Sequence, residues 1–276
     1  MESINLLRQA KHLLRLYSVF PKKRLGQNFT VDLDILYRLT SHASLTNADI
    51  VLEVGAGFGF LTQLLSRECK KVIAIEVDPQ LVSFLRKQLY RLQNVELLEG
   101  DILKVSIPKF HKVVSTPPYS ISSPLLFRLL ESKFECAVLV LQKEFAERLA
   151  ASVGTKDYGR LTVNIYYKAD VELLDFVPRT MFYPQPDVDS IIVRLKPRCP
   201  PFQLDDETIF FDLVRTLFNQ RNKKVRNALT PFLRKREIAK GDAVELADSL
   251  VYSKKRVREL APEDFGILAN KLFQKL

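Results

Sequence analysis

Three glycines in the segment LEVGAGFGFLT are the first candidates for chemistry. Gly55, Gly57 and Gly59 directly follow the apolar run Ile50–Val54. Because glycine has no Cβ, a ligand can approach the backbone closely at such a turn, and the first N–H groups of the next helix can bind it. The spacing is G-x-G-x-G rather than G-x-G-x-x-G, since position 60 is Phe. NAD enzymes and ordinary tight turns share such a turn, so alone it leaves the ligand open.

Acidic residues stand at the ends of the next two apolar runs. Glu76 ends the second run, 21 residues after Gly55, where a carboxylate can accept hydrogen bonds from both hydroxyls of a ribose. Asp101 follows the third run and is suited to hold the exocyclic amine of an adenine. Asp78 is interpreted as a helix N-cap before Pro79. Each of these residues alone is more often a cap or a surface charge, but their placement at successive strand ends favours an adenosyl cofactor.

A rigid corner follows the fourth apolar run, in the segment KVVSTPPYSIS. Val113 and Val114 are typical of a buried strand. Pro117 and Pro118 then remove two backbone donors and fix φ directly before Tyr119. Such a corner at the end of a core strand would hold a tyrosine rigidly at the edge of the sheet.

Alternation of apolar runs with helical patterns predicts a doubly wound, largely parallel sheet. The segment PRTMFYPQPDVD between the last two runs is too short for a crossover helix, so that pair is expected to be antiparallel. The predicted strands are Ile50–Val54, Val72–Glu76, Val95–Leu98, Lys112–Thr116, Cys136–Gln142, Val171–Val177 and Ser190–Leu195, with helices such as Phe60–Arg67, Pro79–Leu89, Ser123–Glu131 and Glu144–Ala151 between and after the first five.

Changes in composition predict three segments. Residues 1–20 have the pattern of a basic amphipathic helix and lack the continuous apolar core of a secretory signal. Residues 21–200 contain the predicted sheet. The proline-rich stretch KPRCPPFQLDDE then precedes a basic helical domain at 201–276.

The overall composition excludes several classes of protein. With 276 residues, 47% of them hydrophobic, the chain can bury a large core. No apolar run approaches the roughly 18 residues needed to cross a bilayer, so we expect a soluble protein without a membrane partner. Three separate cysteines and three histidines make a disulfide framework or a zinc cluster implausible. We therefore expect a cytoplasmic monomer without a metal.

The net charge of +10 is unevenly distributed along the chain. Basic residues dominate two segments, 1–30 and 215–240, in which Glu2 and Glu237 are the only acidic residues. Clustered charge of one sign predicts a polyanionic partner, with nucleic acid favoured over a membrane. A generally basic, solvated surface is the alternative.

Several motifs together resemble a known family. E-V-G-A-G-F-G, the strand-end Glu76 and G-D resemble class I S-adenosylmethionine methyltransferases, and T-P-P-Y resembles the motif of enzymes that methylate exocyclic amines. From about residue 21 to 272 the chain is similar to the KsgA-type small-subunit ribosomal RNA adenine dimethyltransferases, in their archaeal and eukaryotic-like branch. The segments that carry this similarity are RLGQNFTVD, PYSISSPLLFRLL, KDYGRLTV, FYPQPDVDS, LFNQRNKKVRNAL and LAPEDF.

The resemblance implies a fold and a reaction. The fold is a Rossmann-like α/β sheet of seven strands with an antiparallel last strand, followed by a small helical domain. The reaction is S-adenosylmethionine-dependent N6,N6-dimethylation of two adjacent adenosines in the 3′-terminal hairpin of small-subunit ribosomal RNA, with a role in ribosome biogenesis.

The resemblance also implies the roles of the site residues. The amino nitrogen of adenine is a poor nucleophile, so the side chain of Thr116 and the carbonyl of Pro117 would hold its N–H groups while Tyr119 stacks on the base. Phe182 would cover the other face; an exposed Phe is otherwise unexplained, and packing in the core is the alternative. The expected cofactor-binding residues are Gln27, Asn28, Thr30, Gly55, Gly57, Glu76, Asp101, Ile102 and Thr116. The expected RNA-binding residues are Lys22, Lys23, Arg24, Arg221, Lys223, Lys224 and Arg226.

Thr116 and Pro117 depart from the family pattern, which has Asn and then Leu or Ile. A threonine hydroxyl still accepts a hydrogen bond, but it is shorter than an amide and carries a competing donor. Two alternatives therefore stay open. One is an adenine methyltransferase that acts on large-subunit ribosomal RNA or on DNA. The other is an RNA-binding ribosome-assembly factor without strong catalysis.

Overall fold

The computed structural model describes residues 5–17 and 20–275. The chain forms two compact units. The first comprises the chain up to Ala146 together with Val171–Pro197, and the second comprises Glu147–Asp170 together with the chain from Arg198 onwards.

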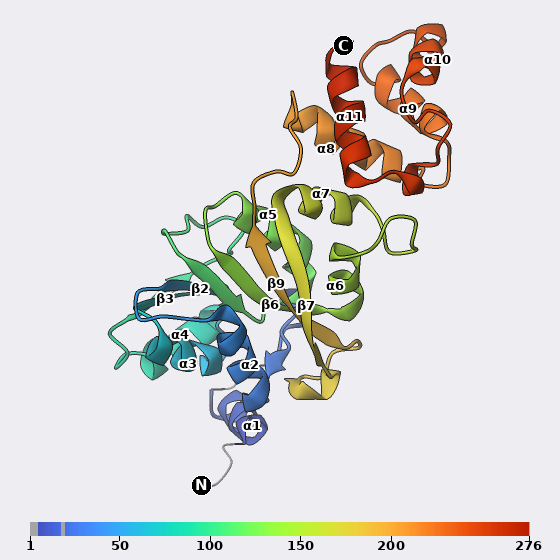
Figure 1. Cartoon of the computed structure of the whole chain (residues 1–276). Helices are drawn as coiled ribbons and strands as arrows, with labels where there is room; N and C mark the ends of the chain where they lie inside the picture. Colours follow the sequence, from blue (N-terminus) through green and yellow to red (C-terminus); the bar gives the residue numbers. More distant parts are fainter. Residues whose placement is uncertain (1–4, 18–19, 276) are drawn as a thin grey trace. The chain divides into compact units, whose positions relative to one another are not determined.

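A seven-stranded sheet forms the centre of the first unit, in the spatial order β4-β3-β2-β5-β6-β9-β7 (Figure 1). Strands β2 to β6 pair in parallel, and β9 runs antiparallel to β6. The predicted doubly wound sheet with an antiparallel strand is confirmed. The strands are β2 (Ile50–Val54), β3 (Lys71–Glu76), β4 (Val95–Glu99), β5 (Lys112–Ser115), β6 (Cys136–Gln142), β7 (Ala169–Val177) and β9 (Ser190–Pro197).

Helices pack against this sheet, and side chains cap the N-termini of α2 and α4. Helix α2 lies against β5, β6 and β9, α3 against β3, and α4 against β3 and β4. At the start of α4, Asp78 accepts a hydrogen bond from the Gln80 N–H at 3.1 Å, which confirms the predicted N-cap. The helices are α2 (Leu33–Ala43), α3 (Phe60–Glu68), α4 (Pro79–Gln88), α5 (Ser122–Leu130) and α6 (Lys143–Leu149), the last of which crosses from the first unit into the second.

Strands β2 and β5 separate towards their carboxyl ends. They pair through Val51–Lys112 and Leu52–Val113. Two residues further on, the Ser115 hydroxyl donates to the Val54 carbonyl at 2.6 Å and accepts from the Val54 N–H at 3.2 Å. The hydroxyl thus satisfies buried backbone groups that have lost their partners in the neighbouring strand. Because the strand order reverses between β2 and β5, this separation lies where open α/β sheets bind ligands.

A two-stranded sheet joins the segment before α2 to the loop before β9. Strand β1 (Phe29–Thr30) pairs antiparallel with β8 (Phe182–Tyr183), with Thr30 opposite Phe182. Residues about 150 positions apart in the chain are therefore brought side by side.

The second unit is helical, as predicted for the C-terminal part of the chain. Its helices are α7 (Arg160–Lys168), α8 (Glu207–Phe218), α9 (Val225–Arg234), α10 (Lys240–Ser249) and α11 (Pro262–Phe273). Phe210, Phe232 and Phe265 are fully buried in its core.

The assignment of residues 147–170 differs from the prediction, which placed them with the sheet in 21–200. Tyr158 of the segment KDYGR is 1% exposed, and its hydroxyl donates to the carbonyl of Leu260 at 2.7 Å. The tyrosine therefore belongs to the core of the second unit. No change of composition at residue 147 marks this boundary.

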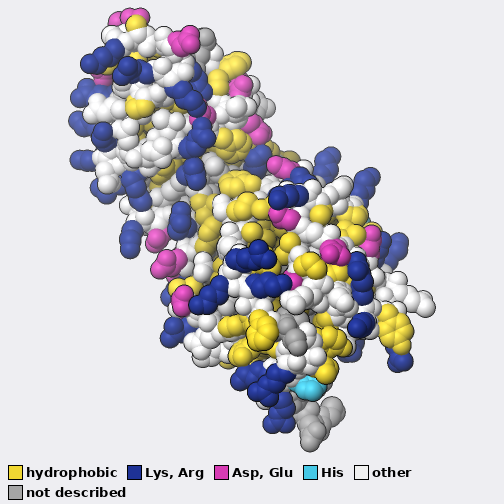
Figure 2. All heavy atoms as spheres, turned by 180° about the vertical axis from the view of Figure 1, so that it is seen from behind, with side chains coloured by type: hydrophobic (Ala, Val, Ile, Leu, Met, Phe, Trp, Pro, Cys, Tyr) yellow, Lys and Arg dark blue, Asp and Glu magenta, His cyan; other side chains and the backbone are white. Residues whose placement is uncertain are grey.

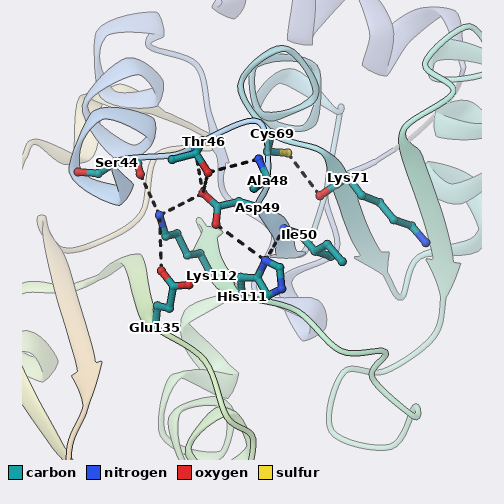
Figure 3. A network of polar contacts seen from close by, with 10 residues as sticks. All are labelled: Ser44, Thr46, Ala48, Asp49, Ile50, Cys69, Lys71, His111, Lys112 and Glu135. Atoms are coloured by element: carbon teal, nitrogen blue, oxygen red, sulfur yellow. Dashed lines mark hydrogen bonds and ion pairs between the residues drawn. The ribbon is translucent and has the colours of Figure 1, made fainter.

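A buried ion pair lies at the amino ends of β2 and β5, away from the carboxyl ends that separate. Lys112 Nζ is 3.1 Å from Asp49 Oδ2 and donates to the Ser44 carbonyl at 2.8 Å, and the two charged side chains are 9% and 7% exposed. The N–H and hydroxyl of Thr46 also donate to Asp49 (Figure 3). The pair connects the end of α2 to both strands.

We expect Lys112→Met to lower the free energy of unfolding by about 3–5 kcal/mol, because it leaves the Asp49 carboxylate buried without its cation. Lys71→Met is the matched control, since its ion pair with Glu96 is exposed and should contribute less than about 1 kcal/mol. Urea denaturation measures both values. Equal stability of the two variants would contradict the assignment.

The same pair predicts a dependence on pH. Burial alone would raise the pKa of Asp49, but hydrogen bonds from Thr46 and Lys112 hold it below its ordinary value of 3.8. The stabilisation is therefore complete above about pH 4 and is lost as the pH falls through the lowered pKa. The stability difference between wild type and Lys112→Met should shrink over that acidic range.

Candidate active site

A deep cavity opens where β2, β3 and β5 end. It is lined by the segment Arg24–Thr30, by the glycine turn after β2, and by residues after β3, β4 and β5. All nine residues predicted to bind a cofactor line this one cavity: Gln27, Asn28, Thr30, Gly55, Gly57, Glu76, Asp101, Ile102 and Thr116. Their roles towards a ligand remain predictions.

The glycine turn is built so that backbone, rather than side chains, faces the cavity. Gly55 and Gly57 have φ angles of 78° and 57°, which side chains rarely allow. A Cβ on Gly57 would lie 3.0 Å from the ring of Phe29. The turn can therefore hold its shape and its contact with β1 only with glycine at this position.

Glu76 fixes this turn to the end of β3. Its Oε2 accepts from the Gly57 N–H at 2.9 Å, and its Oε1 accepts from the N–H groups of Val77 and Asp78 at 2.9 Å. The side chain is buried, and burial raises its pKa although these N–H groups favour the charged form. A carboxylate has about four acceptor positions, so one on Oε2 stays available to a ligand hydroxyl.

Glu53 is a second buried carboxyl at the cavity, and it is not among the residues predicted from the sequence to bind a cofactor. It lies in β2, lines the cavity, and accepts from the Thr62 hydroxyl at 2.6 Å. Burial raises its pKa to about 8. Its signal in the sequence was an acidic residue inside an otherwise apolar strand, IVLEV, where an uncompensated charge would be costly.

Asp101 and Ile102 lie after β4 at the same edge. The Asp101 carboxylate accepts from the Leu103 N–H at 3.0 Å and keeps a partly exposed side chain. Ile102 is buried and presents an apolar surface to the cavity. The Asp101 carboxylate could accept a hydrogen bond from an adenine amine, and the apolar surface of Ile102 could pack against the ring, as the adenine interpretation predicts.

Lys22 and Gln27 form a polar clasp with Asp78. The fully buried carboxylate of Asp78 is 2.6 Å from Lys22 Nζ and accepts from Gln27 Nε2 at 2.9 Å. Gln27 Oε1 also accepts from the Lys22 backbone N–H at 2.7 Å. The clasp holds the segment that covers the cavity, so Lys22 sits in a local ion pair instead of on an open RNA-binding surface, and the side chain of Gln27 is occupied by protein groups.

A smaller cavity adjoins the first. Its lining contains all four residues predicted to act on the target base, namely Thr116, Pro117, Tyr119 and Phe182. Gly26, Asn28 and Thr116 line both cavities. A ligand in the first cavity would therefore meet a ligand in the second beside Thr116.

The two aromatic rings of the smaller cavity, Tyr119 and Phe182, are held by different contacts. The Tyr119 hydroxyl is 2.7 Å from the buried Ser190 Oγ, and burial raises the Tyr119 pKa to about 12. The Phe182 ring lies 6.3 Å from the Tyr119 ring at an interplanar angle of 69°. Phe182 is 4% exposed, so the expectation of an exposed ring is wrong, and core packing explains part of its burial.

The remaining residues predicted to bind RNA fall into two groups. Lys23, Arg24, Lys223 and Lys224 are exposed. Arg221 instead donates to the carbonyls of Thr155 and Lys156, and Arg226 pairs with Asp248 at 3.2 Å. Figure 2 shows Lys and Arg side chains gathered in several places on one face.

Among residues 5–17 and 20–275, no His, Cys, Asp and Glu side chains form a group that could hold a metal ion, and no helix is long and apolar enough to span a membrane.

The clasp predicts a local effect of Asp78→Asn. The amide can still cap α4, but it lacks the charge that pairs with Lys22, so the opening free energy of residues 22–30 should fall by about 1–3 kcal/mol. Hydrogen exchange of these amides measures the change. Asp206→Asn is the control, because Asp206 caps α8 through the Ile209 N–H at 2.8 Å in the second unit. Unchanged exchange at 22–30 would show that the clasp does not hold the segment.

Comparisons with known proteins agree with this geometry. The family described as ribosomal RNA adenine dimethylase matches residues 21–268. A protein of Methanosarcina acetivorans named "Probable ribosomal RNA small subunit methyltransferase A" is 45% identical over 249 residues, covering 90% of this chain and 92% of its own length. A protein of the same name in Thermococcus onnurineus is 43% identical over 257 residues, covering 91% of this chain and 92% of its own length.

Solved structures give the same result. A dimethyladenosine transferase from Plasmodium falciparum superposes with a TM-score of 0.76 and 32% identity, covering 88% of this chain and 97% of its own. The 23S rRNA methyltransferase ErmE superposes with a TM-score of 0.65 and 30% identity, covering 90% of this chain and 100% of its own. The chain therefore has the class I methyltransferase fold and is a methyltransferase that belongs to the ribosomal RNA adenine dimethylase family.

Proposed function

We propose that the protein dimethylates N6 of adenosines in small-subunit ribosomal RNA, with S-adenosylmethionine as methyl donor. The target is a pair of adjacent adenosines in the 3′-terminal hairpin, and the reaction belongs to ribosome biogenesis in the cytoplasm. The observation that carries the proposal is the junction of the two cavities at Gly26, Asn28 and Thr116. A cofactor in the larger cavity and an adenine that enters the smaller one beside Phe182 would meet there.

The residues of the larger cavity fit such a cofactor. S-adenosylmethionine supplies a methyl group on a positively charged sulfonium, together with an ammonium, a ribose and an adenine. The buried carboxyls of Glu53 and Glu76 favour a cationic ligand, Glu76 accepts from the ribose, and Asp101 accepts from the adenine amine. Ile102 packs against the ring, and Gly55 and Gly57, which carry no side chain, let the ligand approach the backbone of the turn closely.

The residues of the smaller cavity orient the target amine. The Thr116 hydroxyl and the Pro117 carbonyl accept from the two N–H groups, which directs the nitrogen lone pair towards the methyl group. The amine needs no strong general base, because the leaving group is already good, and the site acts mainly by positioning. This explains the corner after β5. The Pro117 carbonyl is the acceptor, the Pro118 carbonyl already accepts from the Ile121 N–H, and the two rigid residues hold Tyr119 at the edge of the sheet.

Tyr119 and Phe182 hold the base between them. Tyr119 is fixed through Ser190 and offers a stable stacking face, worth about 1–3 kcal/mol per base. The Phe182 ring lies at 69° to that ring and is buried, so a base held between the two rings requires the Phe182 ring to shift. Exposed Lys223 and Lys224 contact phosphates of the RNA.

Thr116 itself supports a second candidate function, a ribosome-assembly factor that binds RNA and transfers methyl groups weakly. The shorter acceptor lowers the rate and the capacity for a second methylation. Incubation of naked small-subunit RNA and of immature subunits with labelled cofactor, followed by mass mapping of methylated adenosines, tests both candidates. Dimethyladenosine in the 3′-terminal hairpin supports the proposal, and absence of transfer to either substrate refutes it.

Glu76→Ala should weaken S-adenosylmethionine binding by about 1–3 kcal/mol, because it removes a buried acceptor. It should also lower stability, since the N–H groups of Gly57, Val77 and Asp78 lose their acceptor. Glu99→Ala is the control, because Glu99 ends the neighbouring strand with a half-exposed side chain paired to Arg86. Calorimetry measures both affinities. Unchanged affinity in Glu76→Ala would remove Glu76 from the cofactor site.

Thr116→Ala should reduce turnover by about ten- to a thousand-fold, the range for loss of one positioned polar contact. Thr116→Asn should restore or exceed native turnover, because it rebuilds the longer acceptor. Cofactor affinity should change less than turnover in both variants. An inactive wild type together with an active Thr116→Asn variant would establish the assembly factor instead.

A further inference from the structure

The N-terminal helix α1 (Leu6–Leu16) lies outside residues 21–268, which match the family. It is nevertheless part of the folded first unit. Leu6, Ala10 and Leu14 are buried in the core cluster of that unit. Tyr17, directly after the helix, contacts the Phe84 ring edge-on at a centroid distance of 4.9 Å. Asn5 caps the helix by accepting from the Arg8 N–H at 3.0 Å.

The opposite face of α1 carries positive charge. Arg8, Lys11 and Arg15 are exposed and recur about every turn of the helix. Residues 5–17 contain no acidic side chain. Within the described part of the chain, none of the three cations pairs with an acidic partner. At the lower end of Figure 2, where Figure 1 places α1, basic side chains gather.

This face lies beside the proposed target pocket. Lys11 Nζ is 5.2 Å from the centre of the Tyr183 ring. Tyr183 follows Phe182 in β8 and pairs with Phe29 in β1. Phe182 lines the smaller cavity, and Tyr183 is the next residue of the same strand, with its side chain on the other face. Lys11 therefore lies behind the strand that forms one wall of the smaller cavity.

The packing of α1 excludes binding to a membrane through an apolar face. An amphipathic helix on a lipid surface must insert its apolar side chains. On α1 the side chains of Leu6, Ala10 and Leu14 are buried in the core, so they are not available for insertion, and Leu16 is the only exposed leucine of the helix. The main surface that α1 offers to a partner is therefore its charged face.

We propose that α1 is an RNA-binding element, in which Arg8, Lys11 and Arg15 contact phosphates that flank the target adenosine. The proposal rests on the function proposed above and adds a contact surface that the family match does not contain. Because the helix is anchored to the unit that holds the base, its charges position the target strand as well as attract it.

Replacement of Arg8, Lys11 and Arg15 by Gln tests the proposal, since Gln removes charge but keeps helix propensity. The matched control replaces Lys70, Lys109 and Lys133 by Gln. These three are exposed on the same unit, close to the amino ends of β3, β5 and β6. The probe is a synthetic RNA of the 3′-terminal hairpin, and affinity is measured over a range of salt concentrations without cofactor.

The triple α1 variant should lose about 2 units of the slope of log affinity against log salt, because each phosphate contact contributes about 0.7–0.9. Its KM for RNA should rise with kcat and cofactor affinity unchanged, while the control variant behaves as wild type. An α1 variant with the native slope would overturn the inference. So would weaker association with immature subunits but native binding to naked RNA, because α1 would then contact protein. A wild type that binds RNA with the predicted slope but transfers no methyl group would refute the proposed reaction and leave the surface intact.

Discussion

The separation of β2 and β5 at their carboxyl ends is the constraint on which the site depends. Parallel strands that stayed paired to their last residues would leave no room between the glycine turn and the corner at Thr116. The Ser115 hydroxyl makes the separation possible, because it donates to the carbonyl of Val54 and accepts from its N–H inside the core. Without such a substitute, opening the sheet would leave buried backbone groups unpaired, at a cost of about 1–3 kcal/mol each.

Three buried carboxyls surround the opening, and each is compensated differently. Glu76 is held by backbone N–H groups, Asp78 by Lys22 and a helix N-terminus, and Glu53 by the hydroxyl of Thr62. Compensation by a full cation lowers the pKa of Asp78 despite its burial, whereas burial raises the pKa of Glu53 and of Glu76. Through Lys22 and Gln27, Asp78 holds the segment Arg24–Thr30, which lines the cavity, at the start of α4. The two carboxyls with raised pKa values are the ones that gain most from a positively charged ligand.

Tyr119 and Phe182, the two rings of the smaller cavity, are held in place in different ways. Tyr119 is held at both ends, by the prolines before it and by Ser190 at its hydroxyl. Phe182 belongs to a two-residue strand whose partner, β1, is part of the segment that the clasp holds. The segment that lines the larger cavity and the ring of Phe182 in the smaller one are therefore joined by backbone pairing between β1 and β8.

The sequence by itself determined the seven strands, the cap at Asp78, and the glycine turn, strand-end carboxyls and proline corner of the cavities, because these follow from local patterns of apolar runs, glycines, prolines and acidic residues. Gln27, Asn28, Thr30 and Phe182 came from the resemblance to a family, and Glu53 was not predicted. Tertiary structure decided what depends on distant partners. It placed Lys22 on Asp78, 56 residues away, and it buried Phe182 opposite Thr30. It also assigned residues 147–170 to the second unit through Tyr158 and Leu260. A side chain's charge or ring is visible in the sequence, but the partner that neutralises or covers it is set by the fold.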